Sequence, residues 1–250
     1  MKYKPSTKTE LQELVKDESV YLGDIDTSLI TDMSNLFDRS NVYRRDFSGI
    51  ESWDVSNVTD MSYMFCMCFD FNQPLDSWNV GSVEYMMDMF SHCENFNQPL
   101  NSWDVSNVVN MDSMLCECRK FNQPLNSWNV SNVVDMSCMF FECRKFNQPL
   151  NSWDVSNVTD MSYMFEKCVS FNQPLDEWNV ENVTDMCCMF CGCCNFNRSL
   201  EKWGWKVSKV ETETDMFEGC VSLKNKPSWY EWLVEKCQDE FDDECDETLE

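Results

Sequence analysis

The sequence predicts a repeat solenoid with a parallel β-sheet along one face, short helical or 3₁₀ turns, and a short capping helix at each end. The main observation is a period, because tryptophan recurs every 25 residues from Trp53 to Trp203. The five units between Phe71 and Asn195 have equal length and nearly equal sequence. Such a period is typical of stacked repeats, in which each copy buries its apolar face against its neighbours. A hydrophobic content of 43% is sufficient for a continuous core.

Each unit is predicted to contribute one strand and one tight turn. The pattern Leu-x-x-Trp-x-Val has the spacing of a short strand, and the proline before it fits just outside a strand. The pattern Val-x-x-Met-x-x-Met-Phe has a spacing of three to four, which suits a helical or 3₁₀ turn with both methionines inward. Coils stacked at about 4.8 Å would pair equivalent strands and align equivalent side chains in ladders.

The chain divides into four predicted segments. Residues 1–20 are expected to form a capping helix, because Leu11, Leu14 and Val15 lie on one helical face. Residues 21–222 are expected to form about eight repeats. Residues 223–238 are expected to form a second capping helix, because Pro227 suits a helix start. Residues 239–250 contain eight acidic residues in twelve and predict a solvated tail.

Two insertions interrupt the period near the ends of the array. The distance from Met33 to Met61 is 28 residues, which indicates a three-residue insertion near residues 43–46. The distance from Met189 to Met216 is 27 residues, which indicates a two-residue insertion. We therefore expect Trp205, rather than Trp203, to take the tryptophan position of the last repeat.

The composition limits the classes of partner and location. A net charge of −25 should repel nucleic-acid phosphates, so a protein partner is favoured over a nucleic acid. The sequence contains no run of about 18 apolar residues, so it predicts no membrane span. The chain starts with polar sequence rather than an apolar secretion signal, which favours an intracellular or virion location over the cell surface.

Catalytic patterns are missing from the sequence. His92 is the single histidine, which argues against histidine triads and polyhistidine metal centres. Six glycines leave little room for a phosphate-binding loop. We therefore expect a protein that is not an enzyme and that uses no cofactor.

Sixteen cysteines form a column and a scattered set. The column has one member per unit: Cys68, Cys93, Cys118, Cys143, Cys168, Cys193 and Cys220. Stacked neighbours about 4.8 Å apart are too far for an undistorted disulfide, so buried reduced thiols are expected. The scattered set includes Cys188, Cys191 and Cys194 at C-x-x-C spacing, for which a zinc site is an alternative to an absence of metal.

Two sets of surface residues are candidate partner-binding sites. Adjacent units place four basic residues in equivalent columns and predict a docking site for an acidic partner: Arg119, Lys120, Arg144 and Lys145. The residue after each tryptophan alternates between acid and amide: Asp54, Asn79, Asp104, Asn129, Asp154 and Asn179. This alternation either reduces repulsion between stacked carboxylates, with the amides donating to their acidic neighbours, or presents a recognition ladder.

The repeated unit FNQPLNSWDVSNVTDMSYMF at residues 146–165 resembles the BspA-like leucine-rich repeat surface proteins, also described as 26-residue-repeat or Mycoplasma DUF285 proteins. The resemblance extends over roughly residues 8–222. It implies a leucine-rich-repeat-like solenoid, with adhesion or binding roles in many bacterial members. It transfers no catalytic residues, because it is a resemblance of scaffold.

Two functions are consistent with these observations. The first is a non-catalytic protein–protein interaction scaffold that binds through repeated surface ladders. The second is a structural assembly component, such as a minor capsid or virion protein of a large DNA virus. The sequence alone does not distinguish them.

Overall fold

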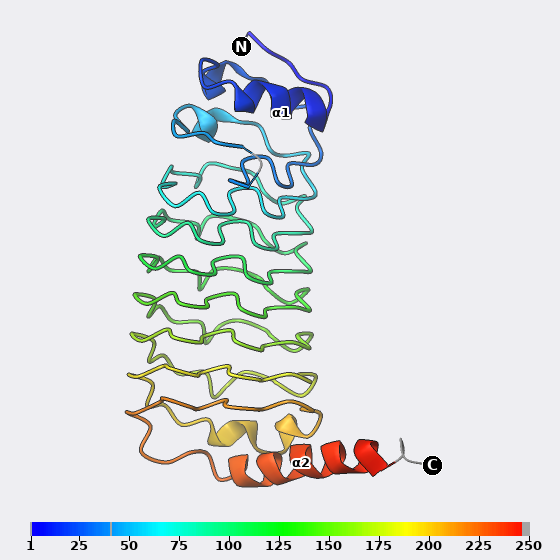
Figure 1. Ribbon diagram of the computed structural model, residues 1–250, viewed down its shortest axis with the longest axis vertical. Helices are drawn as coiled ribbons and strands as arrows, with labels where there is room; N and C mark the ends of the chain where they lie inside the picture. The colour runs from blue at the N-terminus through cyan, green and yellow to red at the C-terminus, as the bar shows by residue number, and fades with distance from the viewer. Residues whose placement is uncertain (1, 41, 247–250) are drawn as a thin grey trace.

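The computed structural model describes residues 2–40 and 42–246, with the side chains of 2–40 and 42–238. The chain winds through successive coils stacked along one axis (Figure 1). Helix α1 (Lys8–Lys16) lies across one end of the stack and helix α2 (Tyr230–Asp246) across the other. Three short 3₁₀ segments are also present: η1 (Leu22–Asp24), η2 (Ile50–Ser52) and η3 (Glu201–Val207).

The predicted parallel β-sheet is wrong, because the described residues contain no strand. Single-residue parallel bridges join neighbouring coils instead. Apart from the bridge between Tyr3 and Ile25, they follow one column: Asp32, Asp60, Tyr85, Asn110, Asp135, Asp160, Asp185 and Thr212. This column lies directly before the first methionine position of each unit, which Glu213 occupies in the last one, and outside the Leu-x-x-Trp-x-Val pattern. The architecture is therefore a stack of turns, and it does not support the leucine-rich-repeat solenoid that we expected.

The segment predicted as a strand consists of two successive β-turns. In the unit 121–145, the Trp128 amide donates to the Leu125 carbonyl at 3.1 Å, and the Val133 amide donates to the Val130 carbonyl at 2.9 Å. All four side chains are buried. Two turns that bury their first and last residues produce the same apolar spacing as a short strand, which explains the error.

The segment predicted as a helical turn is also a chain of β-turns. The Met139 amide donates to the Met136 carbonyl at 3.3 Å, and the Cys143 amide donates to the Phe140 carbonyl at 2.9 Å. Cys138 and Glu142 have φ angles of 53° and 54°. Such left-handed residues prevent the turns from continuing as a helix.

Alternate amides of this segment join one coil to the next. Those of Met136 and Cys138 donate to the carbonyls of Asp160 and Ser162, at 3.1 and 2.9 Å. The intervening amides close the turns, so the segment binds its neighbour through every second residue. In a parallel sheet the intervening amides would donate to the strand on the other side, so their use in local turns distinguishes this stack from a sheet.

Polar side chains supply the other bonds between coils. Trp128 Nε1 donates to the Leu100 carbonyl of the preceding coil at 2.9 Å. In the same way, Asn132 Nδ2 donates to the Ser106 carbonyl and Ser152 Oγ donates to the Asn126 carbonyl, each at 2.7 Å. Asn57, Asn107, Asn157 and Asn182 donate to carbonyls of their preceding coils in the same way as Asn132. These side chains supply hydrogen bonds that strand pairing would otherwise provide.

Stacked aromatic columns fill the core between coils. The rings of Trp128 and Trp153 stack with centroids 6.3 Å apart, and those of Phe121 and Phe146 stack at 6.0 Å. The methionines and column valines beside them are fully buried. Identical neighbours thus pack on one another along the whole axis, as the period predicts.

The last repeat corrects the predicted register. Trp203 is fully buried, and its Nε1 donates to the Leu175 carbonyl at 3.0 Å, whereas Trp205 is 68% exposed. The two extra residues lie inside η3, where Gly204 has a φ of 40°. Trp229, at the beginning of the α2 region, stacks on Trp203 and donates to Leu200 at 2.9 Å.

Helix α1 is held by a residue of the insertion near residues 43–46. The buried Arg44 guanidinium donates to the carbonyls of Val15 and Asp17 at 3.2 and 3.1 Å, and to those of Val20 and Asp46 at 2.6 Å each. At the other end, α2 continues through Asp246, so the segment predicted to be a tail from residue 239 is helical that far. The rest of that predicted tail lies outside the described residues.

Candidate interaction surface

Differences between the units concentrate on one part of the coil. Among the five units from Phe71 to Asn195, the motif F-N-Q-P-L and the core tryptophan, valine, methionine and cysteine positions do not change. Six positions after the first methionine lie outside the core, and in the unit 121–145 they are Ser137, Cys138, Phe141, Glu142, Arg144 and Lys145. Over the five units the first five positions take four different residues each, and the position of Lys145 takes three. We call these positions, taken over all coils, the Met-turn surface. They are mostly exposed or half-buried, so the variation lies where a partner can touch it.

The predicted basic residues lie on this surface, and its carboxylates neutralise the two arginines. Arg119 contacts Glu94 at 3.1 Å and Glu117 at 2.6 Å. Arg144 contacts Glu142 at 2.7 Å, and Arg119 lies 3.6 Å from the same carboxylate. The two arginines are therefore part of an ion-pair ribbon across neighbouring coils.

The electrostatics of this ribbon are visible at Glu142. Burial opposes its ionisation, but the hydrogen bond from Arg144 and the positive charges of Arg144, Lys167 and Arg119 outweigh burial and lower its pKa. Of the two predicted lysines, Lys120 donates to Asn95 Oδ1 at 2.5 Å. Lys145 is exposed and has no ion pair within the described part of the chain.

The Asp/Asn ladder has a local role in most coils. Asp54 Oδ1 accepts from the Ser56 amide at 3.0 Å, and Asn129 Oδ1 accepts from the Ser131 amide at 3.2 Å. Asp104 and Asp154 repeat this contact, and Asn79 does so with Gly81 at 3.3 Å. No hydrogen bond joins neighbouring ladder side chains in residues 2–40 and 42–238, so the expected donation from amide to acid is wrong. Asn179 continues the same column between Trp178 and Val180.

The cysteine column donates hydrogen bonds between coils. Each Sγ lies 2.8–3.2 Å from a backbone carbonyl of the preceding coil. Burial raises the pKa of each column thiol, which keeps the donating proton on sulfur. The described cysteines are all free thiols.

The scattered cysteines are mainly on the Met-turn surface: Cys66, Cys116, Cys138, Cys187, Cys188, Cys191 and Cys194. The Sγ atoms of Cys187 and Cys188 lie 3.8 Å apart, and Cys194 Sγ donates to the Gly192 carbonyl at 3.4 Å. Within the described residues, no group of three cysteine, histidine or acidic side chains is arranged to hold a metal ion. The zinc alternative at Cys188, Cys191 and Cys194 thus receives no support from the geometry.

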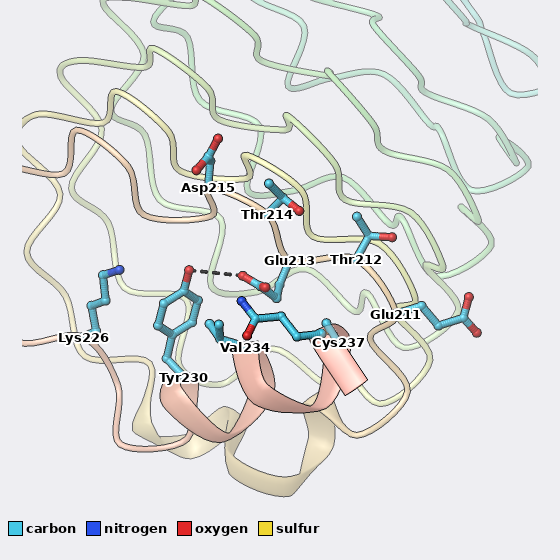
Figure 2. A pocket seen from close by; sticks show the side chains of 10 residues that line it. Glu211, Thr212, Glu213, Thr214, Asp215, Lys226, Tyr230, Val234 and Cys237 are labelled. Carbon is cyan, nitrogen blue, oxygen red and sulfur yellow. Dashed lines mark hydrogen bonds between the residues drawn. The ribbon is translucent and has the colours of Figure 1, made fainter. Parts of the chain in front are cut away.

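A pocket of about 420 Å³ lies between the last coil and α2 (Figure 2). Glu211, Glu213 and Asp215 line it opposite Tyr230 and Lys226. Tyr230 Oη donates to the buried Glu213 carboxylate at 3.2 Å, and the Lys226 ammonium lies 4.5 Å from the centre of the Tyr230 ring. These contacts join the last coil to α2.

The sequence did not single out a cluster at the N-terminal end of the Met-turn surface. The Arg39 guanidinium lies 5.1 Å from the ring centres of both Tyr43 and Phe69. Arg45 lies 5.2 Å from the Tyr43 ring and donates to its hydroxyl at 2.9 and 2.5 Å. Three of these residues fall near the irregular insertion, where the repeat pattern offers no alignment. The signal in the sequence that could have indicated this cluster is the pair of arginines directly after Tyr43.

These features define a tandem-repeat protein with invariant coils and one variable surface. A family model described as "Mycoplasma protein of unknown function, DUF285" matches residues 9–128 and 117–232. The matches together cover most of the chain, so the protein belongs to this family, and the predicted DUF285-type resemblance is confirmed. Comparisons with curated proteins and with solved structures found no match.

Proposed function

We propose that this protein is a non-catalytic interaction scaffold that binds a protein partner through the Met-turn surface. The observation that supports the proposal is the contrast between invariant coils and variable positions on one surface. The invariant polar residues are used to join coils, whereas nothing in the stacking requires Tyr163 where the preceding coil has Cys138. Differences of this kind create a unique surface on a repetitive frame, as a specific binding protein requires.

Binding through a surface is favoured over catalysis by the chemistry available. His92 Nδ1 lies 3.5 Å from Glu117 Oε2 at the edge of the ion-pair ribbon. The core columns repeat, so they cannot supply the asymmetric group of nucleophile, base and oxyanion donor that catalysis needs. Neither described helix has the length and apolar character needed to cross a membrane.

Site-specific photo-crosslinking tests the proposal. Benzoylphenylalanine is placed at Tyr163 or Phe69, which are 37% and 39% exposed on the Met-turn surface. The control position is Asn126, an exposed residue of the Leu-x-x-Trp turn. In extracts of the organism that encodes the chain, we expect the same partner to be crosslinked from the surface positions and absent from the control.

Equal crosslinking from Asn126 and from the surface positions would contradict the proposal, because the partner would then not distinguish the Met-turn surface. Thermal unfolding of each labelled variant provides the control for folding. The substitutions at Tyr163 and Phe69 keep an aromatic ring at each position and add the photoreactive benzoyl group to it.

A further inference from the structure

We infer that Arg39, Tyr43, Arg45 and Phe69 form the anchor of the Met-turn surface, and that this anchor binds an acidic polypeptide segment containing an aromatic side chain. The inference rests on the proposed function and specifies where the partner binds and what chemistry it presents. We call these four residues the arginine–aromatic patch.

The first argument is electrostatic. Neither Arg39 nor Arg45 forms an ion pair with a carboxylate among the residues that the structure describes, whereas Arg119 and Arg144 are both neutralised. Arg44 and Arg198 also lack ion pairs, but both donate to backbone carbonyls, whereas Arg39 and Arg45 lie against aromatic rings. We therefore place the docking site for an acidic partner at the N-terminal end of the Met-turn surface, rather than at the ion-pair ribbon.

The second argument concerns the rings. Tyr43 is 54% exposed and Phe69 is 39% exposed, and Met67 beside them is 41% exposed. Arginine and tyrosine are enriched among the residues that dominate binding energy at protein interfaces. The exposed rings bury apolar area on contact, and the neighbouring guanidinium groups can bind a carboxylate through two parallel N–H donors.

The patch is already organised before any partner binds. Arg39 contacts two rings, and Arg45 is held by the Tyr43 hydroxyl. In the backbone, the Arg39 amide donates to the Cys66 carbonyl of the next coil at 3.1 Å, which places it in register with Met67. Side chains that are ordered in advance lose less conformational freedom on binding.

An acidic peptide segment fits this patch better than a nucleic acid does. Both ligands offer anionic groups and flat rings, but a nucleic acid has a continuous row of phosphates that must approach a strongly acidic molecule. A peptide can confine its carboxylates to one short segment, so fewer of its charges must approach the acidic surface beyond the patch. The carboxylates of Glu18 and Asp70 also act on Arg45, so the positive charge is local and favours a short acidic segment over a continuous polyanion.

Fluorescence anisotropy with a labelled peptide tests the inference. The probe has the sequence of residues 239–250, which contains eight acidic residues and Phe241, with the cysteine replaced by serine. We expect the full-length protein to bind this peptide in trans, and we expect R39Q/R45Q to weaken binding by about tenfold or more. The matched control R119Q/R144Q removes the same charge from the ion-pair ribbon and should change the affinity by less than about twofold.

Three results would overturn the inference: no binding of the peptide to the wild-type protein, equal losses in the two double variants, or tighter binding of single-stranded DNA of similar charge. Circular dichroism checks that both variants remain folded. Crosslinking from Tyr163 separates the two proposals. If that adduct forms but the peptide does not bind, the interaction surface stands and the arginine–aromatic patch is not its anchor.

Discussion

Cys168 illustrates how a single side chain stabilises the contact between two coils. Its Sγ donates to the Phe140 carbonyl at 2.8 Å, in a site from which water is excluded. Cys168→Ala removes one of two donors to that carbonyl, which still accepts from the Cys143 amide, and should cost about 0.5–1.5 kcal/mol in the free energy of unfolding. Cys168→Ser keeps a donor and should lose less. Urea denaturation of the two variants tests this, and equal losses would show that the thiol only fills space.

Two carboxylates should respond to pH in opposite ways. Burial raises the pKa of Asp112 above its ordinary value of 3.8, so ionised Asp112 opposes folding above that value. Asp112→Asn should therefore be more stable than wild type at neutral pH, by less than about 1 kcal/mol because solvent screens the group. The advantage should shrink as the pH falls and should disappear below 3.8, where the carboxyl is protonated in both states.

Asp104 provides the control with the opposite sign. Hydrogen bonds from the Ser106 hydroxyl and amide lower its pKa below 3.8. Ionised Asp104 stabilises the folded state above pH 3.8. This stabilisation is lost as the pH falls through the lowered pKa of Asp104 in the folded state. Asp104→Asn should be slightly less stable than wild type at neutral pH. Unfolding curves between pH 3 and 7 measure both variants, and parallel curves would contradict the assignment.

At the scale of elements, the junction of α1 with the first coils depends on Arg44. Four backbone carbonyls accept from its guanidinium, including that of Val15 in the last turn of α1. Arg44→Met should cost at least about 3 kcal/mol, because it leaves buried carbonyls without donors. Arg44→Lys should not restore stability, since an ammonium lacks the planar fork.

The matched control for Arg44 is its neighbour. Arg45 is exposed, so Arg45→Met should change the free energy of unfolding by no more than about 0.5 kcal/mol. Hydrogen exchange locates the effect, because loss of Arg44 should first expose the amides of α1. Wild-type stability in Arg44→Lys would show that the four hydrogen bonds are not needed in this arrangement.

For the whole molecule, the stack should tolerate the removal of a complete unit. Deletion of residues 121–145 joins Lys120 to Phe146 and keeps every column in register. We expect a shorter, folded protein of lower stability, because contacts are made only between neighbouring coils. Deletion of residues 121–144 leaves one extra residue between two coils. Because the chain accommodates longer insertions near residues 43–46 and in η3, this variant should fold and be less stable than the complete deletion.

Small-angle scattering measures the consequence for shape. The stacked coils in Figure 1 predict a radius of gyration above the roughly 18 Å of a compact sphere of this length. Removal of the complete unit should reduce the radius, because it removes one coil from the stack. An unchanged radius would contradict the stacked arrangement.

Much of the core could be predicted from the sequence because identical spacing in successive units allows only one alignment of neighbours. The buried columns of tryptophan, valine, methionine, phenylalanine and cysteine follow directly from the period. The column of asparagines that includes Asn132 also follows from the period, whereas its hydrogen bonds to the preceding coil are seen only in the structure. The period also located the insertion that contains Arg44, although it gave no role to that residue.

The tertiary structure decided what the spacing leaves open. A row of Leu125, Trp128 and Val130 is compatible with a strand or with turns, and the choice depends on donors such as Trp128 Nε1 that bind a neighbouring coil. The exposure of Trp205 depends on the path of η3. Similarly, the charge of Arg119 is neutralised by glutamates that approach only when coils stack. The sequence by itself determined the repeat and its core, whereas contacts between coils determined the backbone conformation and the charges that remain available on the surface.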